Sequence, residues 1–257
     1  MTLTLDAGNT RLSCGLFDED KLVHTFCREN DGGCTEEALA DFFLSEKKRA
    51  GLALTEISEI SACSVVPSIN STITNACKKA FGKEVLFLQS NCKTGLKISY
   101  NNPEKLGTDR IAAAIGATAL EPDKNLIVVD MGTATTVDVI TKEKEFCGGA
   151  ILPGINLMMK SLVSGTAQLP EVQITQPEKL PGTSTTQCIQ AGVYYGALGG
   201  IKELIQQFTR EIFNGQKPFV IATGGLSYLF ENEGLFDRIE KNLVLEGLNQ
   251  IIKINRR

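Results

Sequence analysis

Short apolar runs alternate along this chain with longer stretches of helical spacing. Runs of strand length occur at residues 3–5, 62–66, 85–88, 126–129, 146–152 and 219–222. Between them, apolar residues recur every three or four positions in 36–49, 69–81, 111–117, 155–163, 185–213 and 243–254. Strands that alternate with helices predict a mixed α/β fold.

Two of the predicted strands end in the same kind of turn. Residues 3–17 read LTLDAGNTRLSCGLF, and residues 126–140 read LIVVDMGTATTVDVI. Asp6 aligns with Asp130 and Gly8 with Gly132, at an offset of 124 residues. Each segment predicts a buried strand that delivers a carboxylate to a tight turn and returns as a second strand. The repeat predicts two domains, residues 1–115 and 116–257.

The composition of these turns suits a nucleotide phosphate. A carboxylate at the end of a strand can hold a hydrated cation, and a nearby glycine lets backbone N–H groups close around a phosphate oxygen. A single D-x-G turn is common in ordinary hairpins, so the interpretation depends on the two matched copies. Further hydrogen-bonding groups come from Asn9, Thr10, Thr133, Thr135 and Thr136.

A third polar motif, G-T-D-R at Gly107 to Arg110, precedes a run of small residues at 112–117. Thr108 or Asp109 would suit the N-cap of the helix predicted there. The start of a helix also binds anions, and Asp109 and Arg110 place opposite charges at that position. The sequence leaves both interpretations open. The small residues also permit close helix packing, either within one chain or between two copies.

The composition of the chain argues against several classes of function. The net charge is -4 and the basic residues are dispersed, which argues against a nucleic-acid partner. No window approaches the length of apolar residues that a membrane span needs, and the first residues already read as a strand, so we expect a cytoplasmic protein. The 8 cysteines include no C-x-x-C pair, and His24 is the only histidine, which argues against a zinc site.

The motifs together resemble those of the type III pantothenate kinases, and they occur in order over nearly the whole chain. They are D-x-G-N-T at 6–10, G-T-D-R at 107–110, D-x-G-T-A-T-T-x-D at 130–138, G-G-x-I-x-P-G at 148–154, T-T-x-x-I-Q-x-G at 185–192 and T-G-G at 223–225.

The resemblance implies an α/β fold of two ribonuclease-H-like domains facing an active-site cleft, as in the actin-like ATPase superfamily of acetate and sugar kinases and heat-shock chaperones. It also implies a homodimer. The implied reaction is the ATP-dependent phosphorylation of pantothenate to 4'-phosphopantothenate, the first step of coenzyme A biosynthesis. The expected cofactors are ATP, Mg²⁺ and a monovalent cation, K⁺ or NH₄⁺.

The same resemblance assigns roles to matching residues. Asp109 would be the general base, Asp130 would bind the monovalent cation, and Asp6 would bind Mg²⁺. The implied ATP contacts are Asp6, Ala7, Gly8, Asn9, Thr10, Arg11, Leu12, Ser13, Thr133, Gly224 and Gly225. The implied pantothenate contacts are Tyr100, Gly107, Thr108, Asp109, Arg110 and Thr185. The chain departs from the family pattern at Ala191, where serine is common, and Arg11 stands at a variable position.

Two other functions remain open. Another small-molecule kinase of the superfamily would share the phosphate hairpins but not the G-T-D-R and T-T-x-x-I-Q motifs. An accessory regulator of transcription would bind nucleotide without turnover, although the intact Asp6, Asp109 and Asp130 favour catalysis. Neither G-x-x-x-x-G-K-[ST] nor G-x-G-x-x-G occurs, so a P-loop or dinucleotide-binding enzyme is excluded as far as motifs can do so.

Overall fold

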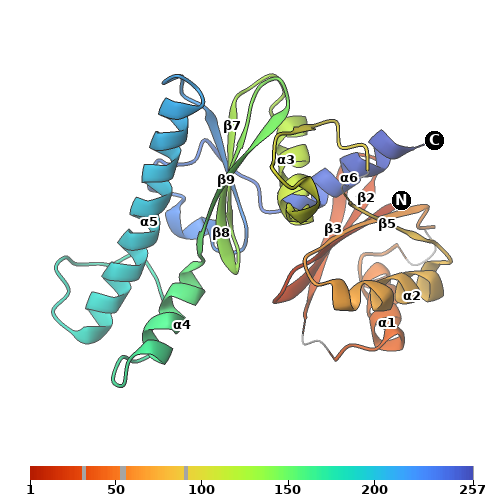
Figure 1. Cartoon of the computed structure of the whole chain (residues 1–257). Coiled ribbons are helices and arrows are strands. Elements are labelled where there is room, and N and C mark those ends of the chain that lie inside the picture. The colour runs from red at the N-terminus through yellow and green to blue at the C-terminus, as the bar shows by residue number, and fades with distance from the viewer. Residues whose placement is uncertain (31–32, 53–55, 90–91, 257) are drawn as a thin grey trace. The chain divides into compact units, whose positions relative to one another are not determined.

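The computed structural model describes residues 1–30, 33–52, 56–89 and 92–256 (Figure 1). They form two compact units, one of Met1–Glu121 with Leu243–Arg257 and the other of Pro122–Asn242. This division differs from the expected ranges 1–115 and 116–257. The last helix returns to the first unit instead of staying with the second.

The first unit is built on a five-stranded sheet in the order β3-β2-β1-β4-β5. Its central strand β1 pairs antiparallel with β2 and parallel with β4. Residues 2–5 of β1 are all buried, as expected of a strand covered on both faces. The strands span Thr2–Ala7 (β1), Arg11–Asp18 (β2), Lys21–Glu29 (β3), Glu59–Ser64 (β4) and Val85–Phe87 (β5).

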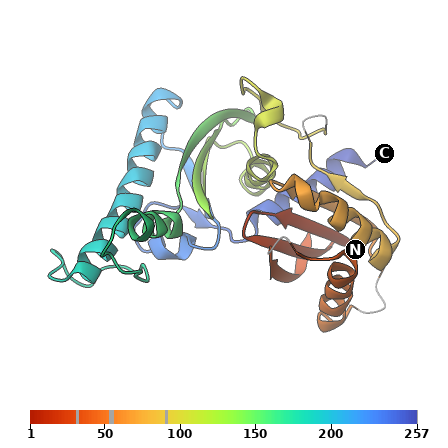
Figure 2. The ribbon, with the colours of Figure 1, turned by 60° about the horizontal axis from the view of Figure 1, so that its bottom comes forward.

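Helices α1 (Glu36–Arg49) and α2 (Asn70–Phe81) pack together on one face of this sheet (Figure 2). Leu3, Leu5 and Ala7 of β1 belong to the core cluster that these two helices share with the sheet. Side chains alternate along a strand, so Thr4 and Asp6 point to the opposite face. That face carries α3 (Thr108–Leu120) and α6 (Leu243–Asn255). The linking segments contain 3-10 turns at Pro67–Ile69 and Pro103–Lys105 and a short strand, β6, at Lys97–Ile98.

Glycines allow α3 and α6 to approach closely. A Cβ atom on Gly247 would overlap the carbonyl group of Ala112, and one on Gly116 would overlap the carbonyl oxygen of Leu243. The small residues of α3 are buried, and they serve packing inside this chain. Of the two alternatives that the small-residue run left open, the structure therefore shows the intrachain one.

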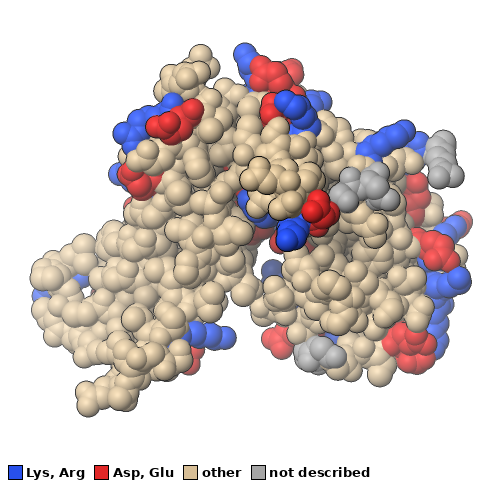
Figure 3. Space-filling view, viewed as in Figure 1, with Lys and Arg blue, Asp and Glu red and all other residues tan. Residues whose placement is uncertain are grey.

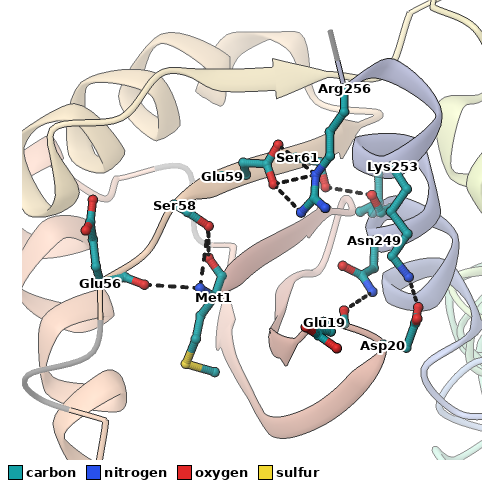
Figure 4. A network of polar contacts seen from close by, with 11 residues as sticks. Met1, Glu19, Asp20, Glu56, Ser58, Glu59, Ser61, Asn249, Lys253 and Arg256 are labelled. Atoms are coloured by element: carbon teal, nitrogen blue, oxygen red, sulfur yellow. Dashed lines mark hydrogen bonds and ion pairs between the residues drawn. The ribbon is translucent and has the colours of Figure 1, made fainter.

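Polar contacts also hold α6 to the first unit (Figure 4). The side-chain amide of Asn249 donates to the backbone oxygen of Glu19 over 2.8 Å. Nearer the end of the helix, Arg256 forms an ion pair with Glu59 of β4, with its Nε 3.0 Å from Oε2. These contacts join residues that are 230 and 197 positions apart in the sequence. They explain why a split at a single point in the sequence does not match the compact units.

The second unit repeats the first, strand for strand. Its strands run in the order β11-β10-β7-β8-β9, with β7 central, antiparallel to β8 and parallel to β10. The first strands of the two units, β1 and β7, start 124 residues apart, at Thr2 and Leu126, so the predicted repeat is confirmed. The strands span Leu126–Met131 (β7), Ala134–Ile140 (β8), Glu145–Pro153 (β9), Phe219–Thr223 (β10) and Arg238–Ile239 (β11).

Two helices complete the core of the second unit. The first is α4 (Ile155–Gly165) and the second is the long α5 (Thr185–Glu211); a 3-10 turn follows β10 at Ser227–Phe230. Buried residues of α4 and α5 join β7 and β8 in one apolar cluster. Within it Tyr194 is fully buried, and its hydroxyl donates to the carboxylate of Glu233 over 2.7 Å.

On the face drawn in Figure 3, Lys and Arg stand in small groups beside Asp and Glu and form no continuous basic area. Within the described residues, no helix has the length and apolar character needed to cross a membrane.

Candidate active site

The turn between β1 and β2 forms the first predicted phosphate loop. The Gly8 N–H donates to the carbonyl of Arg11 over 3.0 Å, which closes the turn. From the end of β3, Asn30 donates its side-chain amide to the Gly8 oxygen over 2.9 Å. Asn9, Thr10 and Arg11 remain exposed at the tip. The turn is therefore fixed at its base and open to a ligand at its tip.

Not every residue of this predicted loop has a side chain available for a ligand. Ala7 and Leu12 are buried in the core, with 0% and 5% of their surface exposed. They can contribute only backbone groups. Ser13 and Asp6, which pair across the hairpin, are both partly exposed.

The carboxylate of Asp6 lies at the carboxyl end of β1, on the face that carries α3. Its Oδ1 accepts a hydrogen bond from the thiol of Cys63 on the neighbouring β4, at 3.3 Å. Burial raises the pKa of Asp6 to about 6. The negative charge of Asp109 also raises it, whereas the Cys63 thiol and Arg11 lower it. Asp6 and Asp109 are therefore close enough to interact electrostatically, although 103 positions separate them in the sequence.

The G-T-D-R motif begins α3, as predicted, but neither proposed capping residue is the N-cap. That position belongs to Gly107, which has no capping side chain. Asp109 lies in the first turn and accepts the N–H of the next residue, Arg110, at 2.8 Å. A Cβ atom on Gly107 would lie 2.5 Å from Oδ1 of Asp109, so this position of the carboxylate requires glycine. The hydroxyl of Thr108 is bonded to the backbone of Ser64.

Two of the predicted pantothenate residues come together beside this helix start. Arg110 is buried, with 8% of its surface exposed, and its guanidinium carbon lies 6.0 Å from the centre of the Tyr100 ring. A guanidinium at this distance from an aromatic face is within cation–π range. The ring itself is 37% exposed. A cation held against an aromatic surface suits a ligand that carries a carboxylate and an apolar part.

The turn between β7 and β8 forms the second predicted phosphate loop. The Gly132 N–H donates to the Ala134 carbonyl over 3.0 Å, which repeats the closure seen at Gly8. A Cβ atom on Gly154 would overlap the Gly132 and Thr133 carbonyl oxygens. The start of α4 thus packs against the back of the turn. Thr133 is exposed at the tip and Asp130 is partly exposed.

Gly224 lies directly against the strand that carries Asp130. Its φ of +86° is in the left-handed region, and a Cβ atom there would lie 2.5 Å from Oδ1 of Asp130 and 2.6 Å from the backbone nitrogen of Met131. Gly225, the next residue, is exposed. The backbone at the end of β10 therefore packs directly against β7 at Gly224 and is exposed at Gly225.

The last predicted substrate residue, Thr185, is the first residue of α5 in the second unit. Ser184 caps this helix by accepting the N–H of Gln187 at 3.3 Å. Ser184 is therefore the N-cap, and the exposed side chain of Thr185 is not occupied as the cap.

These residues fit magnesium-bound phosphates better than a protein-held metal centre. Among the described residues, no group of three His, Cys, Asp or Glu side chains could hold a metal ion. Each hairpin offers one carboxylate beside a closed glycine turn with exposed polar residues. Magnesium usually binds through one or two carboxylates and substrate phosphates, which matches this donor set.

Comparison with known proteins identifies the family. A family model described as type III pantothenate kinase matches residues 2–207. The chain belongs to the type III pantothenate kinase family. A type III pantothenate kinase from Legionella pneumophila (strain Corby) is 43% identical over 255 residues, which cover 99% of each chain. Another, from Francisella tularensis subsp. holarctica (strain OSU18), is 42% identical over the full length of both.

Solved structures confirm the fold of this type III pantothenate kinase family member. A Baf family protein from Campylobacter jejuni aligns with a TM-score of 0.63 at 23% identity, covering 98% of both chains. The activator of 2-hydroxyisocaproyl-CoA dehydratase from Clostridium difficile, with bound ADPNP, aligns at 0.56 and 10% identity, over 99% of this chain and 94% of that one. Both alignments confirm the expected α/β fold of two ribonuclease-H-like domains.

Sequence reasoning missed three residues that support the first hairpin and α3. Cys63 contacts Asp6, Ser64 contacts Thr108, and Asn30 closes the first turn. The strand pattern around 62–66 placed Cys63 and Ser64 near a strand end. It gave no indication of which strand would lie beside them.

Proposed function

We propose that this chain phosphorylates pantothenate with ATP to give 4'-phosphopantothenate, the first step of coenzyme A biosynthesis. The observation that carries this function is the proximity of Asp109, at the start of the G-T-D-R helix, to Asp6 of the phosphate hairpin. A base for the acceptor alcohol and a carboxylate for the nucleotide's metal then share one side of the first sheet. Family membership over the full chain gives the substrate.

In the proposed reaction, the chain mainly positions charged groups. Phosphoryl transfer depends more on alignment and charge neutralisation than on covalent chemistry. Each unit has one phosphate-binding turn, at Asp6 in the first unit and at Asp130 in the second, and Asp109 accepts the alcohol proton. Arg110, held against Tyr100, pairs with the carboxylate of pantothenate. Magnesium, when bound to the phosphates beside Asp6, supplies neutralising positive charge.

The monovalent cation belongs to the same proposal. Asp130 places a carboxylate beside the turn closed by Gly132, and Gly224, which has no Cβ atom, lets the end of β10 pack directly against that carboxylate. Potassium or ammonium bound there would neutralise the part of the negative phosphate charge that magnesium does not neutralise. A homodimer and a cytoplasmic location stay predictions, and light scattering at assay concentration tests the first of them.

One assay of the purified protein tests the function. With ATP, magnesium and potassium, we expect ADP formation that depends on pantothenate, and mass spectrometry should identify 4'-phosphopantothenate. Replacing potassium by sodium should lower the rate, and ammonium should restore it. Equal rates in the three salts would exclude the cation role. Turnover of another alcohol but not pantothenate would indicate a different kinase of the superfamily, and nucleotide binding without any turnover would favour a regulator.

A further inference from the structure

The carboxyl end of β4 brings a buried cysteine beside the phosphate hairpin. In the parallel pairing of β1 and β4, Asp6 is the register partner of Cys63 and Leu5 is the partner of Ala62. Ala62 joins Leu5 in the core cluster under α1 and α2. Side-chain alternation therefore places Cys63 on the opposite face, together with Asp6.

The hydrogen bond between these two side chains has a defined donor and a defined acceptor. Sγ of Cys63 lies 3.3 Å from Oδ1 of Asp6, and Cys63 is completely buried. The thiol is the donor in this hydrogen bond, and the Asp6 carboxylate is the acceptor.

This donor restricts a carboxylate that would otherwise turn easily. The terminal torsion of an aspartate is broad, so packing alone does not fix the direction of its oxygens. Arg11 and Asp109 act on Asp6 with opposite charges. A hydrogen bond to Oδ1 selects one orientation and leaves the remaining lone pairs for a ligand. A thiol is also a weak donor, so it neutralises little of the negative charge that a magnesium-bound phosphate requires.

We propose that Cys63 is a positioning residue of the phosphate site, and that its thiol holds the Asp6 carboxylate in the orientation that binds magnesium-nucleotide. The inference rests on the proposed function, in which Asp6 contacts the metal-bound phosphates. It adds a residue that none of the phosphate or substrate motifs contains.

Three substitutions at this position separate the hydrogen bond from simple packing. Cys63→Ala removes the donor, Cys63→Val removes it while filling the space, and Cys63→Ser restores a hydroxyl donor. The matched control is Cys77→Ala, which empties an equally buried thiol position on α2 within the core of the same unit. Melting temperatures establish that each variant is folded before binding is measured.

The main measurement is the affinity for a non-hydrolysable ATP analogue, by calorimetry with and without magnesium. We expect Cys63→Ala and Cys63→Val to weaken magnesium-nucleotide binding about tenfold, the effect of losing one hydrogen bond to a charged group. Cys63→Ser should stay within about threefold of the wild type because it keeps a donor. Cys77→Ala should bind normally. In turnover, the KM for ATP should rise while that for pantothenate stays unchanged.

The binding series decides the inference separately from the function. Wild-type affinity in Cys63→Ala and Cys63→Val, or equal losses in Cys63→Ser and Cys63→Ala, would overturn the role of the thiol. Equal losses in the Cys77→Ala control would do the same. If the wild type binds nucleotide but does not phosphorylate pantothenate, the proposed function fails and the calorimetric series still tests Cys63.

Discussion

The hydroxyl of Thr108 lies 3.2 Å from both the backbone nitrogen and the backbone oxygen of Ser64. It accepts a hydrogen bond from the first and donates one to the second. Ser64 is the last residue of β4, and Thr108 is the first residue of α3. One side chain thus ties the start of the G-T-D-R helix to the sheet. The position of Asp109, the next residue, depends on this link.

Replacing Thr108 by Val should therefore destabilise the protein and displace Asp109. Valine has a similar shape but leaves both backbone groups of Ser64 without their partner, at a cost of about 1–3 kcal/mol. Thr108→Ser keeps the hydroxyl and should lose much less. Urea denaturation and turnover measure the two effects. If Thr108→Val is as stable as Thr108→Ser, the link contributes nothing to folding.

Asp109→Asn separates catalysis from helix stabilisation. Asparagine can still accept the Arg110 N–H, so we expect stability to change by only a few tenths of a kcal/mol. It cannot take a proton as a carboxylate does, so turnover should fall roughly 10²- to 10⁴-fold. Nucleotide affinity should change little, because in the proposed function the phosphate-binding turns, and not Asp109, contact the nucleotide. Asp41→Asn, on the exposed surface of α1, is the control.

Near-normal turnover in folded Asp109→Asn that binds ATP would remove Asp109 from the mechanism. The alcohol proton would then pass to a phosphate oxygen or to water. Melting temperature, nucleotide affinity and turnover, measured on one preparation of each protein, distinguish these outcomes.

Asp6 gives a pH-dependent stability in the protein without nucleotide or magnesium. Its pKa in the folded state is about 6, raised from an ordinary value of 3.8. The folded state thus binds the proton more tightly than the unfolded state, and ionisation of Asp6 opposes folding. This cost is fully present above about pH 6 and disappears as the pH falls below about 4.

We therefore expect Asp6→Asn to stabilise the protein at pH 7.5 by about 1–3 kcal/mol, with the gain vanishing near pH 3.5. The same substitution should abolish turnover by removing the carboxylate. Denaturant titrations across this pH range provide the measurement. Asp18→Asn, an exposed residue at the end of β2, should have little effect at any pH. If Asp6→Asn stabilises the protein equally at every pH, the stabilisation does not come from removing the carboxylate charge.

Gly224→Ala should damage the second hairpin through the backbone. Alanine at a φ of +86° is strained by about 1–3 kcal/mol, and its Cβ would press on Asp130 and Met131. We expect a lower melting temperature and weaker activation by potassium. Gly199→Ala is the control, because that helical position on α5 has open space around it. It should raise stability by about 0.5–1 kcal/mol. A Gly224→Ala protein as stable as the wild type would contradict the close packing.

The sequence alone predicted most of the elements of the fold and both phosphate turns. Buried strands and amphipathic helices leave local patterns in the sequence. The segment around Asp6 recurs 124 residues later around Asp130, and this repeat predicted the two matching hairpins. The sequence-based prediction missed β3 and β11, and it also missed the two-residue strand β6. β3 alternates exposed with partly buried residues at an edge of the sheet, and β11 has only two residues, so neither has a strong apolar signal.

Tertiary structure alone decided which elements became neighbours. An apolar pattern shows that a face is buried but does not specify what covers it. The parallel pairing of β1 with β4 brought Cys63 to Asp6, and packing of α3 on the same face brought Asp109 into electrostatic reach. Gly247 and Asn249 fix α6 in the first unit, against residues that are distant from it in sequence. The sequence determined the chemical groups and their local turns, whereas long-range packing determined their partners, because contacts between distant segments leave no periodic signal in the chain.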